Sequence, residues 1–255
     1  MLGQTSSNPA LRGDTFRGFV APGQETMTVN GVVTKSLVLL VLLATTFMWT
    51  WNAYTSGDNG LAIGVGSIAG IVGMIVSIVC SFKPQWSPVL APVFALLEGA
   101  ALGLFSAAME NGAATRGYAG YDGVVAQAMM GTMLVFVSML VAYRTGIIKV
   151  TDRFRTIVTT AMMAIFLTYL ATFLLGLVGV NIPAIHESGT IGIAFSLIVI
   201  GVAALMLAVD FDMIERGAQQ GAPKYMEWYG SFALLVTVIW IYIEMLRLLS
   251  KLRSR

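Results

Sequence analysis

The chain has 255 residues, of which 57% are hydrophobic and only 11% are charged, and its formal net charge is +2. A soluble globular domain carries about 25% charged residues, so this composition predicts a polytopic membrane protein. The small net charge argues against a nucleic-acid partner. The single cysteine excludes an internal disulfide, and the single histidine excludes a multi-histidine metal site.

The first 33 residues are polar and contain the turn-forming pairs Asn8-Pro9, Pro22-Gly23 and Asn30-Gly31. We therefore predict a polar N-terminal cytoplasmic segment, residues 1–33, followed by a seven-helix transmembrane domain, residues 34–255. No basic stretch with a short apolar core and a small-residue cleavage site follows Met1. We expect no cleavable signal peptide.

Seven apolar stretches approach the ~20 residues that a membrane-spanning helix needs. They comprise residues 35–51, 61–82, 88–109, 124–143, 156–178, 191–214 and 229–249. The second contains glycines at a spacing of four or fewer, which lets helix backbones approach closely in lipid. The predicted fold class is an all-α polytopic membrane protein with seven transmembrane helices.

Lysine and arginine counts predict the orientation. With the N-terminus inside, the outer loops contain only Arg116, whereas the inner segments contain ten basic residues: Arg12, Arg17, Lys35, Lys83, Arg144, Lys149, Arg153, Arg155, Arg216 and Lys224. This bias favours a cytoplasmic N-terminus. Seven spans then place a basic C-terminal tail outside. The tail either reaches the far interface or stays inside because the last segment re-enters, and we favour seven full spans.

Acidic residues in the last third are the candidate functional residues. Asp210 and Asp212 lie near the end of the sixth apolar stretch, and Glu244 lies within the seventh. A carboxylate in hydrocarbon costs at least ~2.5 kcal/mol, so such residues are rarely kept without a role. We predict that all three form a proton-sensing polar centre inside the bundle.

Two carboxylates that meet in a low dielectric cannot both ionise cheaply, so they can share a proton. Protonated, Asp212 and Glu244 would hydrogen-bond and pin two helices. Deprotonated, they would repel and offer oxygen ligands that suit calcium. In the alternatives, Asp212 is a solvated acid at a helix end and Glu244 pairs with Arg247 at i+3. Asp210, two residues from Asp212, points to another face, so at least one of them meets water or Arg216.

Helix geometry leaves two arrangements open. If the seventh helix begins at Met226, Glu244 lies ~27 Å from its start and Asp212 is out of reach. If the membrane part begins near Phe232, the two acids meet more easily. Glu227 is an alternative partner at the cytoplasmic edge and, with Glu98, a candidate for the ion path. Glu98, in the middle of the third stretch, either lines a pore or makes a structural hydrogen bond.

Several segments together resemble the Bax inhibitor (transmembrane BAX-inhibitor-motif) superfamily, and in particular its bacterial YccA/Bax-inhibitor-like branch. They are Ser7-Asn8-Pro9-Ala10, Thr28-Val29-Asn30-Gly31-Val32-Val33, Leu97-Glu98-Gly99, Ile148-Lys149-Val150-Thr151, Val209-Asp210-Phe211-Asp212, Ala222-Pro223-Lys224-Tyr225-Met226-Glu227-Trp228-Tyr229 and Tyr242-Ile243-Glu244. The resemblance implies seven helices around a central last helix and a pH-sensitive calcium leak gated by two hydrogen-bonded aspartates. Phe211-Asp212 matches the first aspartate. Ile241-Tyr242-Ile243-Glu244 matches the second, except that the longer glutamate replaces aspartate.

Two functions follow as hypotheses. The first, suggested by the buried acids and by the resemblance, is a pH-sensitive cation leak in the plasma (inner) membrane of a bacterium. Calcium is its expected permeant ion, no cofactor is expected, and the bilayer, protons and calcium are its partners. The alternative is a non-transporting membrane regulator that binds a membrane protease or another quality-control partner through its N-terminal segment and basic inner loop. We expect no enzyme, because the chain has no HExxH motif, phosphate loop or well-placed nucleophile motif. The Asp210 region, near a helix end, fits an intramembrane aspartyl protease poorly.

Overall fold

A computed structural model describes residues 25–115, 123–177 and 189–253. Within these ranges the chain is helical, without a β-strand, and seven helices are long and apolar enough to cross a membrane. This confirms the predicted fold class. The helices are α1 (Val29–Thr55), α2 (Asn59–Phe82), α3 (Ser87–Thr115), α4 (Val124–Arg144), α5 (Asp152–Leu177), α7 (Thr190–Gln219) and α8 (Met226–Arg253), with a short 3-10 turn, η2 (Pro84–Trp86), before α3.

Most helices extend beyond the predicted apolar stretches because their polar ends are still capped or paired. The α1 helix begins at Val29, since the Thr28 side chain accepts a hydrogen bond from the Gly31 amide and caps the first turn. The α8 helix begins at Met226 and continues unbroken for 28 residues. At 1.5 Å per residue this is ~42 Å, longer than the ~30 Å hydrocarbon core. It is therefore long and apolar enough for a full span.

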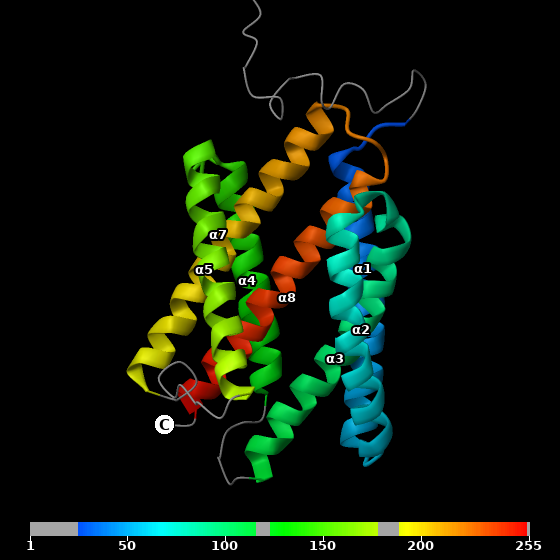
Figure 1. Cartoon of the computed structure of the whole chain (residues 1–255), viewed down its shortest axis with the longest axis vertical. Helices are drawn as coiled ribbons and strands as arrows, with labels where there is room; N and C mark the ends of the chain where they lie inside the picture. Colours follow the sequence, from blue (N-terminus) through cyan, green and yellow to red (C-terminus); the bar gives the residue numbers. More distant parts are fainter. Residues whose placement is uncertain (1–24, 116–122, 178–188, 254–255) are drawn as a thin grey trace, which may run out of the picture.

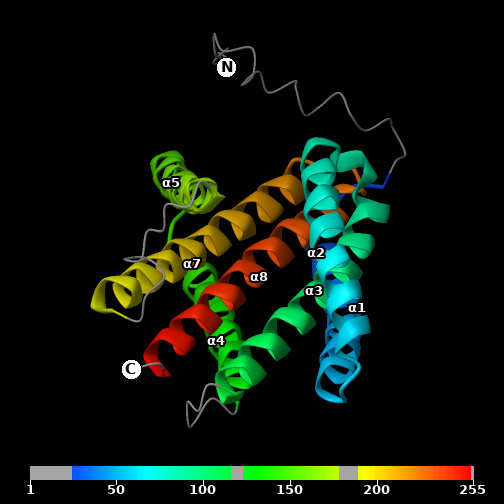
Figure 2. The ribbon, with the colours of Figure 1, turned by 60° about the horizontal axis from the view of Figure 1, so that its bottom comes forward.

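The last helix occupies the centre of the bundle, as the resemblance implies. It is the most buried of the seven spans and contacts α1, α3, α4 and α7. Figures 1 and 2 show α8 crossing between a group formed by α1, α2 and α3 and a second group formed by α4, α5 and α7. Aromatic pairs join it to its neighbours; for example, the ring of Phe232 meets that of Phe94 edge-on at 5.0 Å.

Small residues allow the close approach of α1 and α3. The backbone at Gly99 and Gly103 lies directly against the carbonyl oxygens of Leu43 and Phe47, with no room for a Cβ at either glycine. Glycines of α2 pack in the same way, Gly66 against the side chain of Leu104 in α3. These contacts make α1, α2 and α3 one tightly packed unit beside α8.

Candidate functional site

Four carboxyl groups lie between the helices of the bundle: three belong to contacts that α8 makes with its neighbours, and the fourth, that of Asp212, lies between α5 and α7. Asp210 and Asp212 belong to α7, whereas Glu227 and Glu244 belong to α8, and all four residues are buried. Each carboxyl has different partners, and these partners determine what each can do.

Asp210 lies in the contact between α7 and α8. Its carboxyl accepts a 2.7 Å hydrogen bond from the hydroxyl of Thr237, and the residue is only 4% exposed. Within the described residues no ion pair reaches this carboxyl. Burying a charged carboxylate without a nearby cation costs free energy. The contact between Asp210 and Thr237 is therefore most stable when the carboxyl group is neutral.

Asp212 faces a different direction and is an ion-pair residue. Its Oδ2 lies 2.5 Å from Nη2 of Arg155, at the start of α5, and 2.8 Å from Nε of Arg216, one turn further along α7. Arg216 also donates to the carbonyl of Val150, at 3.2 Å. The acid therefore joins α5 to α7 on the side facing away from Thr237.

Glu244 is completely buried further along α8. Its Oε2 accepts hydrogen bonds from the hydroxyl of Tyr169 in α5, at 2.8 Å, and from Arg247, at 3.3 Å. Its Oε1 is buried and has no hydrogen-bond partner among the described residues. The guanidinium of Arg247 also lies over the Tyr169 ring, 5.1 Å from the centroid.

Glu227 is also fully buried, at the first turn of α8. It accepts hydrogen bonds from the amide and the hydroxyl of Thr28, both at 2.9 Å, and forms an ion pair with Lys35 of α1. Lys224 lies 3.3 Å away, and its hydrogen bond to Glu227 raises the pKa of that lysine. We call Thr28, Lys35, Lys224 and Glu227 the α1–α8 clamp.

Backbone contacts extend this clamp to the turn between α7 and α8. The amide of Met27 donates to the carbonyl of Ala222 at 2.7 Å, and Thr26 forms a β-bridge with Pro223. The start of α1 and the start of α8 are thus held on the same side of the bundle.

A comparison against protein families identifies the family of this chain. The model of a family described as Bax inhibitor 1 like matches residues 8–254. The chain belongs to this Bax inhibitor 1-like family. No match was found among curated proteins or solved structures.

In this Bax inhibitor 1-like chain, the predicted pair of Asp212 and Glu244 is not formed. The contact between Asp210 and Thr237 fixes the antiparallel register of α7 and α8. Asp212 lies two residues from that level in one direction and Glu244 seven residues in the other, a separation of ~13 Å along the helices. The start of α8 at Met226 therefore produces the arrangement in which the two acids cannot meet.

The same register corrects the predicted calcium ligands. Asp212 and Glu244 cannot coordinate one ion together, and within the described residues no three His, Cys, Asp or Glu side chains are grouped to hold a metal. Asp212 pairs with Arg216, and Glu244 pairs with Arg247, as the alternatives from the sequence anticipated. Asp212 is 8% exposed, so it is not a solvated acid.

Glu98 lies apart from the other acids. It faces α2, where a Cβ placed on Gly73 would come within 3.2 Å of its Oε2, and the part of the chain that is described offers it no hydrogen bond. Its neighbour Gly99 faces α1 instead. The structure therefore does not bring Glu98 to the α7–α8 contact. The single histidine, His186, and the outer-loop residue Arg116 lie outside the described residues.

Sequence reasoning missed the neutral partners of the acids. Thr237 lies inside the apolar helix α8, and Tyr169 lies inside α5 next to Thr168. A charged partner, Arg155 at the start of α5, was missed as well. A polar residue inside a span is itself a signal of an interhelical contact. Its partner, however, depends on the packing of helices distant in the sequence.

Proposed function

We propose that the protein is a proton-controlled cation leak, with calcium as the permeant ion, in which Asp210 is the residue that senses protons. The observation that supports this is a carboxyl buried in the α7–α8 contact with a hydroxyl as its hydrogen-bond donor and no ion pair. Membership of the Bax inhibitor 1-like family, and the leak that the resemblance implies, support the same class of function.

The neutral and charged forms of Asp210 have opposite effects on the packing of α7 against α8. A neutral carboxyl is satisfied by Thr237 and leaves α7 and α8 packed together. When the proton is lost, an uncompensated charge lies in a low dielectric, and the contact is stabilised by admitting water or a cation. Rising pH therefore favours separation of α7 from α8 and increases flux.

Two further acids, Glu227 and Glu244, lie along α8 on either side of the level of Asp210. From the α7–α8 turn, Glu227, Asp210 and Glu244 lie at levels separated by ~15 and ~10 Å. The unpartnered Oε1 of Glu244 is the group best placed to meet an entering cation beyond Asp210. Asp212, held by two arginines, instead keeps α5 attached to α7.

Calcium efflux from proteoliposomes tests the proposal. We expect flux to increase as the pH rises, and we expect Asp210→Asn, which resembles the neutral acid, to hold flux low and independent of pH. Asp152→Asn, at an exposed position in the first turn of α5, is the matched control and should retain the pH response.

Two results would contradict this assignment. A full pH response in Asp210→Asn would exclude Asp210 as the sensor. Flux no higher than in protein-free liposomes would exclude the leak itself and favour the regulator alternative.

A further inference from the structure

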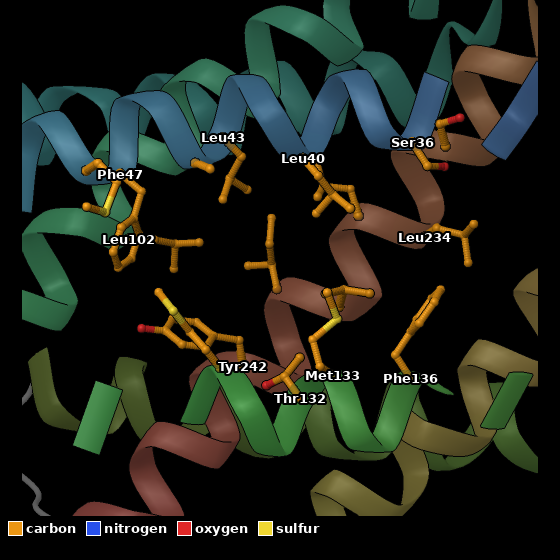
Figure 3. A pocket seen from close by; sticks show the side chains of 17 residues that line it. Ser36, Leu40, Leu43, Phe47, Leu102, Thr132, Met133, Phe136, Leu234 and Tyr242 are labelled. Carbon is orange, nitrogen blue, oxygen red and sulfur yellow. The ribbon is translucent and has the colours of Figure 1, made fainter. Parts of the chain in front are cut away.

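Glu244 lies on the face of α8 that points away from the apolar cavity of the bundle. That cavity lies between α1, α4 and α8, and Figure 3 shows the side chain of Tyr242 among those that line it. Glu244 is two residues further along, about 200° around the helix, and is not among the described residues that line the cavity. The described lining contains no charged residue, so the cavity is a poor route for a cation. A cation that reaches Glu244 therefore uses the other face of α8, towards α5 and α7.

Three charged residues follow one another along that face. Glu244, Arg247 and Lys251 are spaced by three and four residues, so they share one side of α8. The Glu244 carboxyl accepts a hydrogen bond from Tyr169 of α5. The Lys251 ammonium donates to the hydroxyl of Ser196 in α7 at 2.9 Å. From Glu244 towards the end of the helix, this face thus presents one acid and then two bases.

Arg247 occupies the place beside the Glu244 carboxyl. Its Nη1 lies 3.3 Å from Oε2, and its guanidinium lies over the ring of Tyr169, 5.1 Å from the centroid. An arginine side chain is always charged in a protein. The second oxygen, Oε1, has no hydrogen-bond partner among the described residues, but an ion bound there would lie within a few ångströms of the guanidinium and be repelled. Arg247 therefore competes with any cation for this carboxylate.

The arginine can leave this position, whereas the acid cannot. The side chain of Arg247 is 40% exposed and that of Glu244 is 0% exposed. A long side chain six residues from the end of α8 can extend to the membrane interface. Tyr169 would still donate to Oε2 after the arginine had moved. The contact thus consists of a fixed acid and a movable base.

We propose that Arg247 is the specificity-determining residue of the cation leak. It is an internal counter-ion, which a permeant cation must displace from Glu244. A monovalent ion carries the same charge as the guanidinium and gains little by replacing it, whereas a divalent ion interacts about twice as strongly with the carboxylate. The arginine therefore excludes monovalent ions and admits divalent ones such as calcium. This inference rests on the proposed leak and adds the residue that selects its ion.

Efflux of calcium and of potassium from the same proteoliposomes tests this assignment. We expect Arg247→Gln to increase potassium efflux more than calcium efflux. The ratio of calcium to potassium efflux should fall about fivefold, which corresponds to ~1 kcal/mol, the upper range for a partly exposed ion pair. Arg247→Lys keeps the positive charge and should keep most of the selectivity. Arg253→Gln removes the same charge from the same end of α8, where that arginine donates to Gln127 at 2.9 Å, and should leave the ratio unchanged.

A double substitution shows whether the effect depends on Glu244. In the Glu244→Gln background, Arg247→Gln should not change the ratio further, because the carboxylate for which it competes is gone. An increase of both effluxes in either background would indicate a general loosening of the bundle and overturn the assignment. An unchanged ratio in Arg247→Gln, or an equal fall in Arg253→Gln, would overturn it while leaving the leak in place. Efflux no higher than in protein-free liposomes for every variant would overturn the leak and the assignment together.

Discussion

The α1–α8 clamp allows a quantitative prediction about stability. Glu227 is completely buried, whereas Lys35 and Lys224 have side chains that are 18% and 45% exposed. Glu227→Gln retains the shape of the side chain and an oxygen that can accept from both groups of Thr28. It removes the charge and replaces the oxygen that accepts from Lys35 with an NH2 group, which cannot accept a hydrogen bond. The substitution therefore separates the electrostatic contribution from packing.

Two terms contribute to the loss of unfolding free energy that we expect for Glu227→Gln. Hydrogen bonds to a charged group stabilise by ~1.5–3 kcal/mol and neutral ones by ~0.5–1.5 kcal/mol, so weakening both bonds from Thr28 costs about 2 kcal/mol. The mostly buried Lys35 loses its partner, which adds ~1–2 kcal/mol. The half-exposed Lys224 adds little, because water screens it. The sum is about 3–4 kcal/mol.

Thermal unfolding in nanodiscs and amide exchange measure this loss. At ~2–4 °C for each kcal/mol in a chain of this size, we expect Tm to fall by about 10 °C. The amide of Thr28 should also exchange faster, since its acceptor is weakened. Lys35→Gln in the Glu227→Gln background should cost much less than in the wild type. A Tm within 2 °C of the wild type, or additive effects of the two substitutions, would refute the reasoning.

Three further substitutions follow from the contacts. Gly31→Ala should destabilise the protein by ~1–3 kcal/mol in the same unfolding assay, because the buried carboxylate of the clamp leaves no space for a Cβ; an unchanged Tm would contradict this. Thr237→Val should cost ~1–3 kcal/mol by leaving Asp210 without a donor, and Thr237→Ser should restore most of it; equal losses in both variants would exclude the hydrogen bond. Arg155→Gln should cost less than ~1 kcal/mol, because its side chain is 39% exposed and a second arginine still pairs with Asp212; a larger loss would show that the pair is more deeply desolvated than its exposure indicates.

The candidate site could be predicted only in part. The rarity of acids in apolar stretches singled out Asp210, Asp212 and Glu244, and all three are buried. The pairing of Asp212 with Glu244 was wrong, because it required a register that α7 and α8 do not adopt. Asp210 instead meets Thr237, a residue that no local pattern distinguishes from other threonines in a span.

The sequence by itself determined the seven spans, because the length and apolarity of a helix are local properties that the thickness of a bilayer selects. It also determined which side chains cost free energy when they are buried in lipid and therefore need polar partners. Only the tertiary structure decided which residues are those partners. Arg155, Tyr169 and Thr237 reach their acids through the packing of helices far apart in the chain, and a shift of one or two residues in that packing would replace every contact.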